Sequence, residues 1–448
     1  MNEVARGSNF SLANIFLATL ILEPLLFFVL ADRNTFGFNI NISRILQIIV
    51  IFGLVIKFLI FRGQLIISNH VLKIASGYLL YSLYMILLTF IGVFTAVYGK
   101  SAFDFLPSRV VLEIIISLYY FLYFAILPIY FFRTRESKLK VLNTLKSVFT
   151  IFLLLGFLDL LLFRLGLPSI PRHLGDIDVG FRFHSIAGEP RDAAVFIIFC
   201  LGALHLYQIY EERFKISPLV TFSAIAALIL TVSVSAILAS SFIAILTFFY
   251  FLRLNFFSYP LIKYLLFFFL LIPILFILYT IIMSSERMAL YIDAFGLLYD
   301  LLRQGLVPDT LSGQMVNIYP LWQRYQEFLD FNFYGIIFGS GIGSSSVLNN
   351  IFYDSANLST GELLNPHANI IRLFYEGGIA GSMLFLFGLI YSFKFLNLSK
   401  DNLIYVNYLF LGIFGAFMAH RSLMFFIFLG LIYMLFNKDN YDDEQNNA

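Results

Sequence analysis

Residues 218–253 read PLVTFSAIAALILTVSVSAILASSFIAILTFFYFLR, with no charged side chain before Arg253. Because about 20 apolar residues cross the hydrocarbon core of a bilayer as a helix, this stretch is too long for a single crossing. Its middle, from Thr231 to Ser241, is rich in small hydroxyl residues, which satisfy irregular backbone inside a membrane protein. The stretch therefore predicts two short or tilted membrane helices separated by a turn, at residues 218–233 and 235–252.

The composition of the whole chain also indicates a membrane protein. Of its 448 residues, 60% are hydrophobic and only 12% are charged, whereas the charged share of a soluble domain is about 25%. The net charge of +2 gives no reason to expect a nucleic-acid partner. Cys200 is the single cysteine, which excludes an internal disulfide and a cysteine-rich metal site. We predict an all-α, polytopic integral membrane protein with a single membrane domain, 1–448.

Apolar runs elsewhere in the chain bring the prediction to about 12 transmembrane helices. The first run is longer than the core of a signal peptide, which has about 7 to 15 residues, so we expect a retained helix there. Besides the two crossings within 218–253, the predicted crossings are this first run at residues 11–31 and residues 40–61, 71–98, 108–132, 141–163, 191–210, 260–283, 376–396, 403–419 and 421–437.

The basic residues predict which side of the membrane each connection faces. Cytoplasmic connections carry an excess of Lys and Arg, and residues 133–140 are rich in both. Twelve crossings then place the other basic connections and both termini inside, whereas a single helix over 218–253 would place two basic connections outside. Two connections are long, 164–190 and 284–376, and both face outward. The polar tail at 437–448 is predicted to be a disordered cytoplasmic end.

Signatures of nucleotide and metal chemistry are missing from the sequence. The GKS sequence at 99–101 lacks the earlier glycine of a phosphate-binding loop. The GSGIG sequence at 339–343 lacks the spacing of a dinucleotide fingerprint and indicates a flexible turn. The histidines are dispersed, and none is paired at helical spacing with a glutamate. We expect no cofactor and no metal, so an enzyme of this kind needs a substrate that is already activated.

The shorter outward loop carries a candidate anion site. Arg182 and Arg191 flank the GEP sequence at 188–190, and guanidinium groups bind phosphate through paired hydrogen bonds. If the proline begins the next helix, Arg191 lies in its first turn, where free backbone N–H groups also favour an anion. An alternative stays open, in which both arginines are interfacial anchors that pair with Glu189 and Asp192.

The longer outward loop carries a candidate proton acceptor. His367 precedes a predicted helix start and is the only histidine of that loop. The unperturbed pKa of histidine, about 6.5, suits it to accept a proton from a hydroxyl group. A capping or packing role is the alternative. Further candidates for substrate contacts are Asn369, Arg324, Arg372 and Glu376, and Glu376 is expected to pair with an arginine of the same loop.

Some charged residues fall inside predicted membrane helices. Glu23, followed by Pro24, is predicted near the middle of the first helix, where a carboxylate is costly. It indicates a polar path or a pairing with an arginine such as Arg44. Other charged residues lie nearer to helix ends, and the simplest interpretation is that they reach toward the interface, namely Asp159, Glu113 and His205.

Several motifs, taken in order, resemble those of the O-antigen polymerase and ligase superfamily, whose members assemble bacterial envelope polysaccharides. The resemblance covers residues 180–385, and the remainder only by its number of predicted helices. The residues that carry it are Arg182 with Gly188-Glu189-Pro190, the hydroxyl-rich break at 231–235, Gly339-x-Gly341-x-Gly343, His367-x-Asn369 and Glu376-Gly377-Gly378-Ile379-x-Gly381. Two departures are visible, because Ala368 separates His367 from Asn369, and Glu189 stands where the ligase-like pattern has asparagine.

The second departure favours a polymerase over a ligase. The resemblance implies a Wzy-type polymerase, a metal-independent glycosyltransferase at the outer face of the bacterial inner membrane. Its donor and acceptor are glycan repeat units carried on polyprenyl pyrophosphate, and a chain-length regulator is an expected partner. By the resemblance, Arg182 and Arg191 hold the donor pyrophosphate, and His367 positions or deprotonates the acceptor hydroxyl. The residues expected to contact substrate are Glu189, Arg324, Arg372, Glu376 and Asn369.

Two alternatives remain. An O-antigen ligase shares the mechanism and transfers the finished glycan to lipid A-core or another acceptor. A polysaccharide flippase or other transporter also has about 12 helices, but it rarely needs an outward segment as long as 284–376.

Overall fold

The computed structural model describes residues 2–23, 25, 29–31, 40–60, 68–95, 107–167, 182–187, 190–231, 333–343, 369–418 and 424–437. Within these ranges the regular elements are helices, apart from two very short antiparallel strands, β1 (Val29–Ala31) and β2 (Ile40–Asn41). The predicted helical class is therefore confirmed for the described residues. The predicted crossings at 235–252 and 260–283 lie outside them.

In this part of the chain, six helical stretches are long and apolar enough to cross a membrane. Five of them lie in α3 (Ile42–Ile60), α4 (Asn69–Thr95), the continuous run of α6 (Pro107–Tyr120), η1 (Phe121–Ile126) and α7 (Leu127–Phe131), α8 (Arg135–Arg164) and α9 (Pro190–Tyr210). The sixth, Glu376–Phe395, starts within α18 (Asn369–Ser392) and continues through η4 (Phe393–Phe395). The other helices are α1 (Asn2–Leu22), α10 (Pro218–Leu230), α15 (Phe333–Phe338), α19 (Lys400–Met418) and α20 (Met424–Phe436), with the short turn η2 (Ser185–Ala187).

The outer faces of these helices are apolar. On α3, Ile48, Phe52 and Leu59 are 64, 66 and 69% exposed, and Leu154 on α8 is 65% exposed. Soluble proteins rarely expose contiguous apolar surface of this kind, because its hydration is unfavourable. Contact with lipid removes that cost. The lengths of the helices and their apolar outer faces together identify a membrane-spanning protein.

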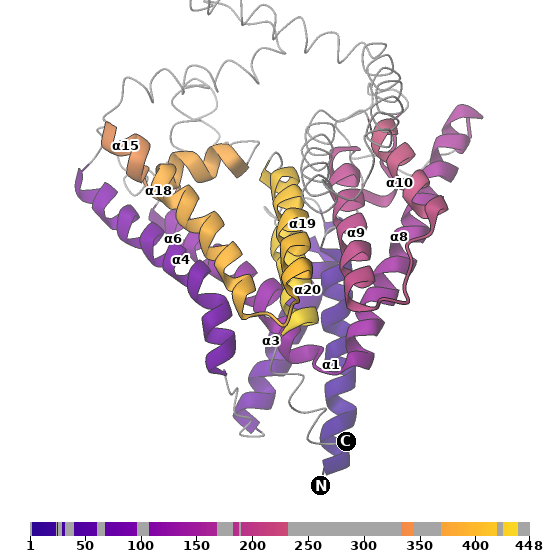
Figure 1. Ribbon diagram of the computed structural model, residues 1–448, viewed down its shortest axis with the longest axis horizontal. Helices are drawn as coiled ribbons and strands as arrows, with labels where there is room; N and C mark the ends of the chain where they lie inside the picture. Colours follow the sequence, from indigo (N-terminus) through magenta and orange to yellow (C-terminus); the bar gives the residue numbers. More distant parts are fainter. Residues whose placement is uncertain are drawn as a thin grey trace, which may run out of the picture. The chain divides into compact units, whose positions relative to one another are not determined.

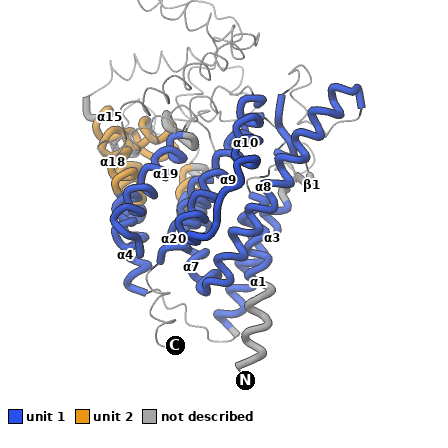
Figure 2. Tube along the Cα trace, turned by 45° about the vertical axis from the view of Figure 1, so that its right-hand side comes forward, with its two compact units in different colours: residues 1–79, 117–247, 388–448 blue, residues 80–116, 248–387 orange. Residues whose placement is uncertain are grey.

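The chain forms two compact units (Figure 2), of which unit 1 contains residues 1–79, 117–247 and 388–448, and unit 2 contains residues 80–116 and 248–387. In unit 1, α9 and α20 run side by side (Figure 1). Helix α9 also packs against α8, α10 and α19, and every residue of α20 is buried. Helix α20 is apolar all round, and a helix of this kind belongs in the interior of a bundle.

Glycines let the helices of unit 1 approach closely. A Cβ atom at Gly430 of α20 would lie 2.0 Å from the carbonyl oxygen of Phe124 in η1. One at Gly202 of α9 would lie 2.1 Å from Cδ1 of Ile413 in α19. Small residues at such crossings are typical of membrane helices, whose association depends on close packing.

Two predicted helix boundaries are wrong. Helix α1 ends at Leu22, so Glu23 lies at its carboxyl end and not at the middle of a crossing over 11–31. The physical reason is Pro24, which has no N–H to donate and disfavours helical backbone at the preceding residue. Helix α8 starts at Arg135 rather than at 141, because Thr134 caps it by accepting a hydrogen bond from the backbone N–H of Ser137 at 3.2 Å.

Helix starts near the candidate site agree with the sequence. Helix α9 begins at Pro190, so Arg191 lies in its first turn, and α18 begins at Asn369, directly after the NPHA sequence. Because α18 starts before the predicted crossing 376–396, Glu376 lies within a helix. Helix α18 is interrupted at Gly378, whose φ of 63° and ψ of −166° only glycine adopts readily. It therefore consists of two helical halves joined at a glycine.

Candidate functional site

Residues 182–187 of unit 1, which we call the arginine segment, are fixed at the end of α10. The backbone N–H of Phe183 donates to the carbonyl of Leu230 at 2.9 Å. Nε of Arg182 donates to the carbonyl of Thr231, the C-cap residue of α10, at 2.8 Å. A guanidinium group at the carboxyl end of a helix also interacts favourably with the helix dipole. Arg182 is thereby held in place at the end of α10.

Side chains of the arginine segment also attach it to α8. Phe183 is fully buried, and its ring occupies the space beside Gly156, where a Cβ atom would lie 2.2 Å from Cζ of the ring. Oγ of Ser185 donates to the carbonyl of Phe152 at 2.7 Å. Ser185 has a φ of 50°, which is uncommon for a residue other than glycine and persists where surrounding contacts hold it. These contacts make the segment a fixed part of unit 1.

A buried pair of titratable residues connects the same two elements. Nδ1 of His184 lies 3.3 Å from Oδ2 of Asp159 in α8, and the two side chains are 1% and 2% exposed. The prediction that Asp159 reaches toward the membrane interface is therefore wrong. A buried carboxylate is costly without a polar partner, and His184 provides one. The sequence does not predict this pairing, because His184 comes from a separate segment with no fixed spacing to Asp159.

Arg191, the second predicted anion-binding residue, is half-buried in the first turn of α9. The backbone N–H groups of that turn have no partners within the helix, and the helix dipole favours an anion there. The neighbouring Asp192 is buried. Glu189, between Arg182 and Arg191 in sequence, lies outside the described residues. Two of the predicted arginines thus belong to one short stretch of unit 1.

Unit 2 contains the other described candidates. Nε of Arg372 lies 3.3 Å from Oε2 of Glu376, one turn later in α18, so the expected pairing of Glu376 with an arginine is confirmed. A terminal nitrogen of Arg372 also donates to Glu113 of α6. Glu113 therefore pairs inside unit 2, contrary to the prediction that it reaches toward the interface. The charges of Glu376 and Glu113 raise the pKa of Arg372 above its ordinary value.

The glycine-rich turn at 339–343 contacts the same carboxylate. The N–H of Gly343 donates to Oε1 of Glu376 at 3.1 Å, and the N–H of Gly341 donates to the carbonyl of Glu376 at 2.9 Å. The N–H of Ile342 donates to Oγ1 of Thr89 in α4 at 2.9 Å. Gly339, Gly341 and Gly343 all have positive φ, which explains why glycine recurs at alternate positions. The predicted turn is present, and these contacts hold it.

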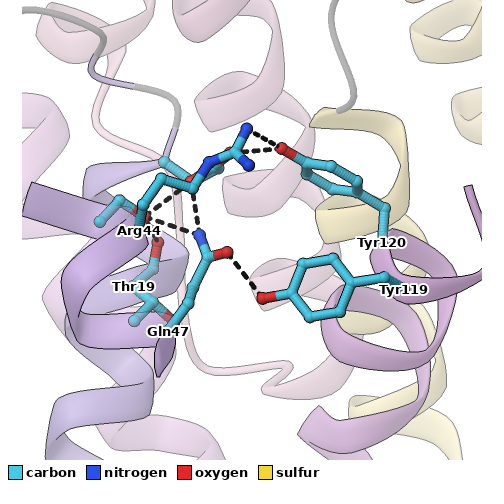
Figure 3. A network of polar contacts seen from close by, with 7 residues as sticks. Thr19, Arg44, Gln47, Tyr119 and Tyr120 are labelled. Atoms are coloured by element: carbon cyan, nitrogen blue, oxygen red, sulfur yellow. Dashed lines mark hydrogen bonds and ion pairs between the residues drawn. The ribbon is translucent and has the colours of Figure 1, made fainter. Parts of the chain in front are cut away.

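A third polar cluster lies in unit 1, where α1, α3 and α6 meet (Figure 3). The carboxylate of Glu23 accepts hydrogen bonds from Ser43 at 2.7 Å, Gln47 at 2.6 Å and Tyr120 at 3.0 Å. The guanidinium of Arg44 lies 3.7 Å from it and donates to the hydroxyl of Tyr120. The predicted pairing of Glu23 with Arg44 is confirmed. A carboxylate with so many partners is suited to a membrane protein's interior.

The remaining predicted site residues are not placed. His367, Arg324 and Glu189 lie outside the described residues, and of Asn369 the structure gives only that its backbone begins α18. Among the described side chains, no group of three or more His, Cys, Asp or Glu residues is arranged to hold a metal ion.

In comparisons with known proteins, no family model, no curated protein and no solved structure matches the chain.

Proposed function

We propose that the chain is an integral membrane glycosyltransferase, a polysaccharide polymerase that joins oligosaccharide repeat units carried on polyprenyl pyrophosphate. The observation that carries the proposal is the placement of Arg182 and Arg191 in unit 1. Arg182 is held at the carboxyl end of α10, and Arg191 lies in the first turn of α9. Two guanidinium groups with the N–H groups of a helix start suit a pyrophosphate. The motif order that resembles the O-antigen polymerase and ligase superfamily supports a glycan as the transferred group.

The proposed reaction is a displacement at the anomeric carbon of the donor sugar. The acceptor hydroxyl attacks that carbon and forms the glycosidic C–O bond, while the bond from the carbon to the pyrophosphate oxygen breaks. The electron pair leaves with polyprenyl pyrophosphate, and the hydroxyl proton passes to His367, acting as base. Arg182 and Arg191 stabilise the charge that develops on the departing pyrophosphate. Loss of one such donor costs about 2.7 to 4 kcal/mol at a transition state.

The same proposal includes the topology. It places about 12 crossings in the bacterial inner membrane, both termini in the cytoplasm, and the loops 164–190 and 284–376 on the outer side. The membrane-length helices and the basic connections support it. Substrate contacts are proposed for Glu189, Arg324 and Asn369, and a chain-length regulator is the proposed partner. Arg372 and Glu376 contribute to the proposed site through the ion pairs and hydrogen bonds that they make within unit 2.

Deletion of the gene tests the reaction class. If the chain is a polymerase, the surface glycan of the deletion strain is reduced to a single repeat on its final carrier. Full-length glycan that remains on the lipid carrier would instead identify a ligase. Repeat units trapped on the cytoplasmic side would identify a flippase and overturn the proposal.

Single substitutions test the site. Arg182→Ala, Arg191→Ala and His367→Ala are expected to shorten or abolish the glycan ladder at matched protein levels. Arg135→Ala is the matched control, because this exposed arginine pairs with Glu211 on the surface of unit 1 and should leave the ladder unchanged. Wild-type ladders in all three site variants would eliminate the proposed roles.

A further inference from the structure

The break in α18 brings two backbone segments of unit 2 into direct contact. A Cβ atom at Gly339 would lie 2.4 Å from the carbonyl oxygen of Glu376, and one at Gly378 would lie 2.5 Å from the backbone nitrogen of Gly339. Backbone atoms cannot move aside as a flexible side chain can. The turn 339–343 therefore fits against the break because both segments are glycine there. Together with Glu113, Arg372 and Glu376, we call this arrangement the glycine clamp.

Helix α4 holds the turn from a second direction. The hydroxyl of Tyr84 donates to the carbonyl of Phe338 at 2.7 Å, and it also lies 3.3 Å from the carbonyl oxygen of Gly377. Thr89 accepts the N–H of Ile342. A Cβ atom at Gly341 would lie 2.8 Å from Cα of Thr89. One tyrosine thus contacts both segments, the end of α15 and the break in α18.

The charged groups of the glycine clamp form ion pairs with one another. Glu376, 4% exposed, accepts hydrogen bonds from Gly343 and Arg372. Arg372 in turn bridges Glu376 and Glu113. A buried carboxylate that accepts from a backbone N–H and a guanidinium is stable only while those partners stay in place. The orientation of the first half of α18 is therefore fixed by these contacts, since the break at Gly378 interrupts the helix that would otherwise fix it.

We propose that Glu376 and Arg372 are positioning residues, which hold the first half of α18 and so fix the point at which the segment containing His367 joins it. His367 precedes Asn369, the first residue of α18, by two positions. The inference rests on the proposed function, in which His367 serves the acceptor. Neither Glu376 nor Arg372 needs to touch substrate in this role.

A labelling experiment tests the clamp without any assay of activity. Cys200→Ala removes the single cysteine, and Ser340→Cys then places a thiol in the turn. Reaction with N-ethylmaleimide is followed in native membrane vesicles. Glu376→Ala is expected to speed labelling about tenfold, because the turn loses a charge-assisted hydrogen bond. Glu376→Gln keeps an acceptor for Gly343 and is expected to have a smaller effect.

The control for labelling is Glu211→Gln, which removes a carboxylate from an exposed pair with Arg135 and should change nothing. If Glu376→Ala does not accumulate in the membrane, Arg372→Lys replaces it, since lysine keeps the charge but not the bridge to two carboxylates. If the variants that accumulate in the membrane were labelled at the same rate as the parental protein, the proposed role of the glycine clamp would be wrong.

Kinetics with purified lipid-linked repeat units separate positioning from substrate binding. A positioning role predicts that Glu376→Ala lowers kcat by about tenfold or more and Glu376→Gln lowers it by less, while KM changes by less than about twofold in both, because uniform binding is retained. A raised KM with unchanged kcat would instead make Glu376 a substrate contact and overturn the inference. If the parental protein forms no polymer, the proposed function fails, whereas the labelling result still decides whether the clamp exists.

Discussion

Nδ1 of His184 lies 3.3 Å from Oδ2 of Asp159, and both side chains are almost completely buried. One residue belongs to the arginine segment and the other to α8, so the pair attaches the segment that carries Arg182 to a membrane-spanning helix. The hydrogen bond from Ser185 to Phe152 and the ring of Phe183 beside Gly156 reinforce the same attachment. The position of a predicted anion-binding arginine thus depends on the contacts that its neighbours make with α8.

Removing one partner of the buried pair should destabilise the protein. Asp159→Ala or His184→Ala is expected to lower the free energy of unfolding by about 1 to 3 kcal/mol, because the change removes the buried contact between the two side chains. The double variant should lose less than the sum of the two. Unfolding by SDS in detergent micelles measures these changes, with the exposed Glu136→Ala of the same helix as control. Strictly additive losses would show that the two residues do not act as a pair.

The contact between Phe183 and Gly156 predicts a size-dependent effect. Gly156→Ala places a methyl group 2.2 Å from the present position of the ring, so the ring must move, and the expected loss of stability is about 1 to 3 kcal/mol. Phe183→Leu, added as a second change, should recover part of that loss. Leu154→Ala, on the exposed face of α8, is the control and should have little effect in micelles. An unchanged midpoint for Gly156→Ala would contradict the observed packing.

The polar cluster around Glu23 predicts a modest loss of stability when one hydroxyl oxygen is removed from it. Tyr120→Phe removes the hydroxyl that donates to Glu23 and accepts from Arg44, and it should cost about 1 to 3 kcal/mol, the range for a buried group left unsatisfied. Tyr391→Phe, on an exposed tyrosine, is the matched control. Equal stabilities of the two variants would show that the hydroxyl of Tyr120 contributes nothing to the cluster.

Local sequence signals predicted much of the fold. Runs of apolar residues predicted the membrane-length helices, and Pro190 predicted the start of α9 because proline is preorganised for a first helical turn. The pairings of Glu23 with Arg44 and of Glu376 with Arg372 were also predictable, since an ionisable group in a membrane needs a partner. In the second pair the partner is one helical turn away.

Contacts between separate segments could not be predicted in this way. Nothing in the spacing of Asp159 and His184 relates them, because the arginine segment brings them together only when it folds back on α8. The fit of the turn 339–343 to the break in α18 is likewise a relationship between backbones far apart in sequence. Glycines at 339, 341 and 378 indicated unusual backbone in both segments, but they did not predict that the two segments are in contact.

The close approach at Gly378 predicts a cost beyond backbone strain. Gly378 has a φ of 63°, and its Cβ would lie 2.5 Å from the backbone nitrogen of Gly339 and 2.6 Å from the carbonyl oxygen of Ile337. Gly166 has a similar φ of 68°, but nothing lies within 4 Å of its Cβ position. Both alanine variants bear the strain of positive φ, about 1 to 3 kcal/mol, and the ψ of −166° at Gly378 makes that strain larger there. Gly378→Ala must in addition separate two backbones, which are less able to yield than side chains.

Gly378→Ala should therefore destabilise the protein more than Gly166→Ala in the same SDS titration, and it should also expose a thiol at Ser340→Cys to N-ethylmaleimide. Gly166→Ala should leave that thiol as protected as in the parental protein, because Gly166 follows α8 in unit 1 and takes no part in the clamp. If both variants lost the same stability and neither changed labelling, backbone strain alone would explain Gly378. The conformation of α18 would then not depend on the turn at 339–343.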